Sequence, residues 1–225
     1  MDSPRDQSNR LLSLIVHELR APGAVVSGYL RLLLKGGSQK LSEPERQMIE
    51  DASKCCARLL RVVQEIEEYT DIDRPERFQG LEPVRVFSLC EETVRETRAS
   101  DGLLAFVCPT DDRLAIVRGE PHRLKQALAG LVALTVREHG ARPVEVAGFV
   151  SHETSDPRAV IAFGSPGLVH ADVLVARAAE FDPWRGGMGL VVPIASRILE
   201  LHGGRIWSLQ DAPAACAISL PLATP

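Results

Sequence analysis

Apolar residues in the first 35 positions recur at alternating steps of three and four, the spacing of an amphipathic helix. A second segment after residue 42 repeats this spacing. Ser42, followed three residues later by Glu45, predicts a capping box at its start, and the polar, glycine-containing stretch 35–41 predicts a turn between the helices. The two stripes comprise Leu12, Ile15, Leu19, Pro22, Val26, Tyr29 and Leu33, and then Met48, Ala52, Cys55, Leu59, Val62, Ile66 and Tyr69.

Two long helices joined by a short turn predict an antiparallel hairpin. One apolar stripe on each helix offers too little surface for a core of its own. Pairing of two hairpins into a four-helix bundle would bury both stripes. We therefore expect a homodimer with two-fold symmetry.

The rest of the chain alternates between strand-like and helix-like segments. A polar stretch without helical period predicts a linker at 74–80, between a hairpin domain at 1–73 and a second domain at 81–225. The order of segments predicts an α/β two-layer sandwich with helices on one face of a mixed sheet, and hence an α+β chain. The predicted strands are 84–87, 103–108, 144–150, 159–163, 205–209 and 217–220, and the predicted helices are 91–97, 121–139, 171–180 and 190–202.

Composition and charge narrow the function classes. The chain has 45% hydrophobic and 25% charged residues, as ordinary soluble globular proteins do. A net charge of −4 gives no support for a nucleic-acid partner. We find no membrane-spanning apolar run, signal peptide or lipidation motif, so we expect no membrane association and a cytoplasmic location. The five cysteines lack metal-ligand spacing, which predicts reduced, mostly buried thiols and no metal site.

Candidate chemistry lies at residues 16–22, Val-His-Glu-Leu-Arg-Ala-Pro. His17 lies two residues after Ile15, about 200° around a helix that turns roughly 100° per residue, so it should face away from the stripe and into solvent. An exposed imidazole can act as a nucleophile at neutral pH. Glu18 can orient the ring or accept its proton, and Arg20 is a candidate local charge partner.

The pattern His-Glu-Leu-Arg-x-Pro in the first helix of such a hairpin resembles the phosphoacceptor box of the sensor histidine kinases of two-component signalling. The resemblance continues through most of the chain. Residues 198–206 are similar to the end of that family's catalytic ATP-binding domain, whose fold is shared with gyrase and Hsp90-type ATPases, and 120–126 are similar to the start of its asparagine-box helix. The resemblance implies that His17 is a phosphoacceptor, that the chain dimerises, and that its partners are response-regulator receiver domains.

Several positions depart from the pattern of that family. Its two asparagines, which hold magnesium through side-chain oxygen, correspond to Gly130 and Leu134 here. The aspartate that recognises adenine corresponds to Phe163, and Ser165 replaces a glycine of the following motif, in which Gly167 remains.

The phosphate-side glycine motif keeps Gly187 and Gly189 but has Val191 in place of a third glycine. Too few residues separate the Phe-Asp-Pro-Trp segment at 181–184 from this motif for an ATP lid. Arg137 is retained from the family's pattern, but an arginine at a solvated helix end also has a structural explanation. Ala21 departs from the pattern, because many members carry threonine or asparagine there. We therefore expect ATP and magnesium to bind weakly or not at all, and no other cofactor.

Three hypotheses follow. In the first, the chain is a dimeric, degenerate histidine kinase that exchanges phosphate between His17 and receiver domains as a phosphotransferase. In the second, it is a non-catalytic pseudokinase that regulates a receiver or another histidine kinase by binding. In the third, it is an atypical but active histidine kinase. The intact pair of His17 and Glu18 favours the first, and the departures in the nucleotide site disfavour the third.

Overall fold

The computed structural model describes two compact units, residues 1–74 and residues 75–225. Within them, the described residues are 4–35, 41–72, 80–97, 103–109, 111–152, 156–167, 178–184, 189–209 and 212–223. Side chains of the first helix are described from Leu12 onward.

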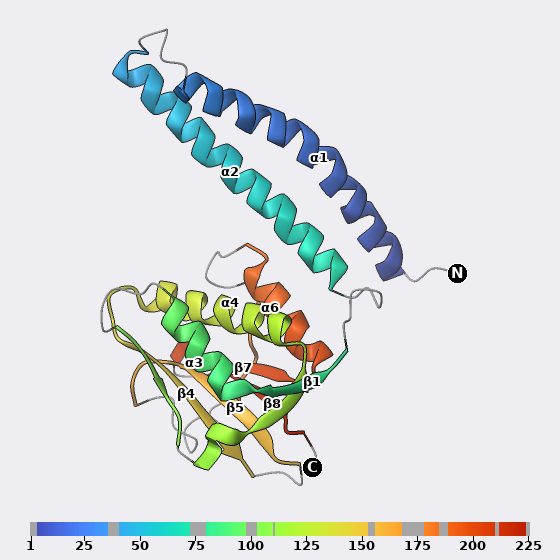
Figure 1. The fold of residues 1–225 in the computed structure, drawn as a ribbon, viewed down its shortest axis with the longest axis vertical. Coiled ribbons are helices and arrows are strands. Elements are labelled where there is room, and N and C mark those ends of the chain that lie inside the picture. The colour runs from blue at the N-terminus through green and yellow to red at the C-terminus, as the bar shows by residue number, and fades with distance from the viewer. Residues whose placement is uncertain are drawn as a thin grey trace. The chain divides into compact units, whose positions relative to one another are not determined.

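The first unit is an antiparallel pair of helices, α1 (Pro4–Lys35) and α2 (Glu43–Asp71), as Figure 1 shows. The predicted capping box is confirmed at the start of α2. The Glu45 carboxylate accepts hydrogen bonds from the Ser42 backbone N–H at 2.8 Å and from the Ser42 hydroxyl at 2.7 Å. Helix α1 continues through Pro22 and is visibly curved, as expected where proline removes a backbone hydrogen bond. Most of the predicted turn at 35–41 lies outside the described residues.

The face that closes the hairpin is not the predicted stripe. Val16 and Val63 are buried between the helices, at 4% and 3% exposure. The helices approach closely at Gly23, where an added Cβ would lie 2.7 Å from Cδ2 of Leu60. The predicted stripe is largely exposed in the single chain, including Ile15, Leu19, Val26, Tyr29, Leu33, Met48, Leu59 and Val62. Each helix thus carries two adjacent apolar stripes instead of the single one expected, and only one of them closes the hairpin.

The second unit contains a six-stranded mixed sheet in the order β2-β4-β5-β8-β7-β6. Strand β2 pairs parallel with β4, and the other neighbours pair antiparallel. A separate antiparallel pair is formed by β1 (Glu82–Arg85) and β3 (Ile116–Gly119). The six strands are β2 (Leu104–Val107), β4 (Val144–Ser151), β5 (Arg158–Gly164), β6 (Ala178–Ala179), β7 (Arg205–Leu209) and β8 (Ala212–Pro221).

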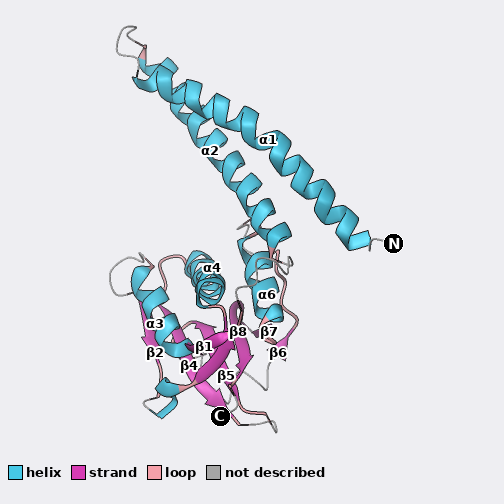
Figure 2. Ribbon diagram, turned by 45° about the vertical axis from the view of Figure 1, so that its right-hand side comes forward, coloured by secondary structure: helices cyan, strands magenta, loops and turns pink. Residues whose placement is uncertain are grey.

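Helices α3 (Val86–Glu96), α4 (Pro121–His139) and α6 (Val191–Leu201) lie together on one side of this sheet in Figure 2. A short 3-10 helix, Asp111–Leu114, precedes β3. The main core lies between the helices and the sheet. The predicted two-layer α/β sandwich and the α+β class of the whole chain are confirmed. Fully buried side chains from both layers include Phe87, Leu124, Leu128, Leu131, Ile161, Ile198 and Ile218.

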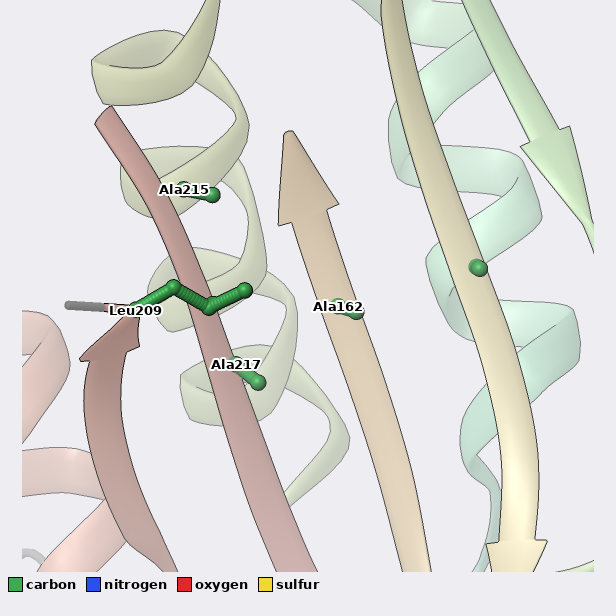
Figure 3. Close-up of a cluster of buried hydrophobic side chains, with 5 residues drawn as sticks. Ala162, Leu209, Ala215 and Ala217 are labelled. Carbon is green, nitrogen blue, oxygen red and sulfur yellow. The ribbon is translucent and has the colours of Figure 1, made fainter. Parts of the chain in front are cut away.

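A second, smaller cluster lies on the opposite face of the sheet. Gly148 on β4 faces α3, since an added Cβ would lie 2.6 Å from Phe87, so its neighbour Ala147 faces away from the helices. Ala147, Ala162 and Ala217 are in register across β4, β5 and β8. Figure 3 shows two of these alanines with Leu209 and Ala215. Phe149, Trp207 and Ala212 pack against this cluster.

Most predicted elements of the second unit exist, with three differences. The predicted strand 84–87 is β1 at Glu82–Arg85, and its last two residues, Val86 and Phe87, instead begin α3 on its buried face. Strand β3 was not predicted. The predicted helix at 171–180 is wrong at its end, where 178–179 form β6, and its residues 171–177 lie outside those described. None of the described helices has the length and apolarity needed to span a bilayer.

The five cysteines are free thiols, as predicted. The expectation that most of them are buried is wrong. Cys90 and Cys216 are buried, whereas Cys56 and Cys108 are half-buried and Cys55 is exposed on α2. Burial raises the pKa of the Cys90 thiol far above its usual range, so this cysteine packs as a small apolar side chain.

The burial of Val16 and Val63 between the two helices can be tested by placing a charge at one of these positions. Val63→Asp should strand a carboxylate between the helices, which costs several kcal/mol. We expect it to lower the thermal midpoint of hairpin unfolding, measured by circular dichroism. Arg61→Asp introduces the same residue at an exposed position of α2 and should have little effect. Equal midpoints for the two variants would contradict this packing.

Candidate functional site

His17 projects from α1 into solvent, with 87% of its side chain exposed. The sequence-based prediction that His17 is exposed to solvent is confirmed, although the buried residue beside it is Val16 and not Ile15. Glu18 is 73% exposed, and its Oε1 lies 3.8 Å from Nδ1 of His17. This distance suits an electrostatic contact and is too long for a hydrogen bond. Glu18 thus lies on the Nδ1 side of the ring, and Nε2 faces away from that carboxylate.

Arg20 is engaged with the second helix. Its guanidinium donates a hydrogen bond to the carboxylate of Glu67 on α2, and the two side chains are 52% and 38% exposed. This hydrogen bond, together with Coulomb attraction to the carboxylate, raises the pKa of Arg20. The guanidinium is therefore charged at any pH at which the protein folds.

Sequence reasoning missed Glu67. The predicted stripe of α2 contains Ile66 and Tyr69. The hairpin instead closes along the neighbouring stripe, which contains Val63, Glu67 and Thr70. A signal was present, because an acidic residue interrupts that otherwise uncharged stripe at helical spacing. The opposing stripe of α1 has the same form, with Arg20 between Val16 and Gly23.

Two positions with asparagine in the resembled family are packing positions here. Gly130 is buried on α4, and an added Cβ would lie 2.9 Å from Cγ1 of Val191 and 3.7 Å from Cβ of Ala195. Both contacts are with α6. Leu134, one turn further along α4, is 0% exposed. Neither residue offers an oxygen from its side chain, and both help to pack the unit.

The remaining predicted nucleotide positions lie at the end of β5 and around the start of α6. Phe163 on β5 is 0% exposed. Ser165 is half-buried, and Gly167, with a φ of 84°, is exposed in the turn after β5.

Gly189, with a φ of 67°, precedes α6, and Val191 is the first residue of that helix. Residues 185–188, which include Gly187 and the stretch predicted to be too short for an ATP lid, lie outside the described residues. Arg137 is exposed in the last turn of α4, where a cation suits the helix dipole. No three acidic, histidine or cysteine side chains within the described ranges come together as metal ligands would.

Comparison with known proteins relates both units to one family. The family model described as the His Kinase A (phospho-acceptor) domain matches residues 7–75. The sensor protein DivL of Caulobacter vibrioides is 28% identical over 209 residues, which are 88% of this chain and 26% of that protein. The histidine kinase AtoS of Escherichia coli is 25% identical over 224 residues, 94% of this chain and 34% of that protein. The chain thus spans about a quarter to a third of these relatives.

Solved structures show the same fold. Full-length ShkA in complex with AMPPNP superposes on 96% of this chain and 46% of its own, with a TM-score of 0.67 and 22% identity. The histidine kinase AdeS of Acinetobacter baumannii superposes on 92% of this chain and 98% of its own, with a TM-score of 0.53 and 17% identity. At these identities the likeness concerns the arrangement of elements alone.

The contact between Gly130 and Val191 generates a stability prediction. Gly130→Ala should gain up to about 1 kcal/mol of helix propensity, but overpacking against a stiff β-branched side chain costs about 1–3 kcal/mol. We expect a net loss, measured by urea denaturation.

In a Val191→Ala background the obstruction is removed, so Gly130→Ala should become neutral or stabilising there. If Gly130→Ala stabilised the unmodified chain by its full helix propensity, the close approach of α4 and α6 would be refuted.

Proposed function

This chain belongs to the two-component sensor histidine kinase family, and on that premise we propose that it works as a histidine phosphotransferase. His17 accepts a phosphoryl group from the aspartyl phosphate of one response-regulator receiver domain and passes it to another. The observation that carries the proposal is a contrast between the units. The imidazole of His17 is 87% exposed beside Glu18, whereas Leu134 and Phe163, at two nucleotide positions, are buried in packing.

The proposed reaction is a balanced displacement at phosphorus. Nε2 of His17 attacks the phosphorus of the acyl phosphate, the P–O bond to the aspartate breaks, and the carboxylate leaves with the electron pair. The new P–N bond leaves a positive charge on the ring, which Glu18 offsets from the Nδ1 side or relieves by accepting the Nδ1 proton. The reverse reaction delivers the phosphoryl group to a second receiver.

The second unit supports a role without ATP. Magnesium prefers oxygen ligands, and Gly130 and Leu134 supply none from their side chains. Phe163 cannot accept a hydrogen bond from an adenine amino group. A kinase needs metal, base recognition and phosphate positioning together. We therefore propose that ATP and magnesium bind weakly or not at all and that the chain carries no other cofactor.

The exposed stripe of the hairpin supports a homodimer. Leu59 and Val62 on α2, and Leu19 and Val26 on α1, belong to an apolar face that the single chain leaves in solvent. Large contiguous apolar faces of this kind mark interaction surfaces. In the proposed assembly, two hairpins bury this face as a four-helix bundle.

The same apolar face favours a second candidate function. A pseudokinase that binds a receiver or another histidine kinase needs the exposed face of the hairpin and no phosphoryl chemistry. The two candidates differ in one residue, because only phosphotransfer requires the imidazole of His17.

Labelling separates these candidates and the alternative of an active kinase. Incubated with radiolabelled ATP and magnesium alone, the full chain should stay unlabelled. Incubated with a phosphorylated receiver, it should acquire label that His17→Ala abolishes and His122→Ala, at an exposed histidine on α4, leaves unchanged. Label from ATP that His17→Ala removes would establish an active kinase. A receiver that binds the chain without labelling it, with a cellular output that His17→Ala preserves, would establish the binding module.

The dimer has its own test. Leu59→Glu places a charge in the apolar face proposed to be buried between protomers, at a position that is 50% exposed in the single chain. We expect it to shift the chain from dimer to monomer in sedimentation velocity at micromolar concentration, with the helical content retained. An unmodified chain that sediments as a monomer under these conditions would refute the assembly.

A further inference from the structure

The pair of Arg20 and Glu67 is a single charged layer in the closed stripe of the hairpin. Val16 and Thr70 lie buried on one side of it, at 4% and 2% exposure, and Val63 lies buried on the other. The Thr70 hydroxyl donates to the Glu67 carbonyl oxygen at 2.9 Å, within α2. An ion pair as exposed as this one, with side chains at 52% and 38% exposure, contributes little to stability. The charges therefore call for an explanation other than packing.

The layer lies next to the phosphoacceptor. Arg20 follows His17 by three residues on α1, and side chains three apart are neighbours on a helix surface. A phosphoryl group on His17 would bring a charge of about −1.5 to −2 and three acceptor oxygens into reach of that guanidinium. Arginine binds such groups through two parallel hydrogen bonds. Glu67 holds the same guanidinium in the unphosphorylated chain.

We propose that Glu67 is a positioning residue that holds Arg20 away from the phosphorylated imidazole of His17. Glu67 thereby keeps the phosphohistidine weakly stabilised, so that its phosphoryl group is easily passed on. The inference rests on the proposed phosphorylation of His17 and assigns a role to a residue outside the His-Glu-Leu-Arg motif. Without Glu67, Arg20 would pair with the phosphoryl group and make it a poorer donor.

The exposure of the groups sets the size of the effect. All of the partners are at least one-third exposed, with Arg20 at 52%, Glu67 at 38% and His17 at 87%. Solvent screens such pairs strongly. Releasing Arg20 should therefore change the equilibrium between phosphohistidine and receiver by roughly fivefold, and not by orders of magnitude. A change of this size shifts the equilibrium of phosphoryl transfer and still allows transfer in both directions.

The experiment uses the full chain phosphorylated chemically with phosphoramidate, whose P–N bond breaks to release ammonia as the P–N bond to histidine forms. Phosphorus NMR follows the ionisation of the phosphoryl group with pH, and signals that persist in His17→Ala are discarded. Glu67→Gln should lower the midpoint of this titration by about half a pH unit, because the freed guanidinium favours the dianion. Glu68→Gln, which removes the adjacent carboxylate of α2, is the matched control and should leave the midpoint near that of the unmodified chain.

The double variant identifies the group responsible. In an Arg20→Gln background, Glu67→Gln should no longer shift the titration midpoint. The only remaining change is the loss of the Glu67 charge, whose effect on the phosphoryl group is screened by solvent and salt. A shift that persists without Arg20, or one no larger than that of Glu68→Gln, would overturn the inference. If Glu67→Gln changed the midpoint of thermal unfolding and left the phosphoryl titration unchanged, the ion pair would have only a structural role. That result would also overturn the inference.

Failure of the proposed function is distinguishable from failure of this inference. An Arg20-dependent shift in a chain that no phosphorylated receiver labels would support the role of Glu67 and refute phosphotransfer. Labelling by a receiver with no such shift would refute the role of Glu67 alone.

Discussion

The close packing of α1 on α2 is the constraint on which the rest of the hairpin depends. Because Gly23 lets Leu60 approach its backbone, the helices meet along Val16 and Val63 and turn their second apolar stripes outward. The same rotation sets His17 on the solvent side. It also brings Arg20 and Glu67 together, one turn from His17. Orientation of the imidazole, exposure of the apolar face and pairing of the charges are thus consequences of one helix rotation.

Local sequence signals predicted much of this structure. The capping box of Ser42 and Glu45 and the bounds of α4, Pro121–His139, agree with the structure because each depends on residues close together in the chain. The exposure of His17 was predicted from its angle relative to Ile15, although the buried residue of that turn is Val16. The choice between two neighbouring apolar stripes could not be made in this way. It depends on where Leu60 of one helix finds space on the other, and a glycine at position 23 does not by itself reveal its partner.

The candidate site shows the same division. His17, Glu18 and Arg20 were found from their order in the chain, and the structure exposes His17 and Glu18 but pairs Arg20 with the second helix. Glu67 is 47 residues from Arg20, and no spacing rule connects them. The resemblance indicated which positions depart from the family's pattern, but it could not show how the residues at those positions pack. The structure answers that for Gly130, beneath the first residue of α6, and for Phe163, within the core.

The contact of α4 with α6 also bears on how such a chain can evolve. Where a glycine lies directly beneath a β-branched residue, any side chain introduced at the glycine meets an obstacle, whatever its chemistry. A lineage that gained a side chain at position 130 would first have to change Val191, and that change alone introduces no metal ligand. Selection therefore sees no benefit in the first step, and a direct second step reduces stability. Packing of this kind couples the two positions, because a side chain at position 130 is tolerated only together with a substitution at position 191.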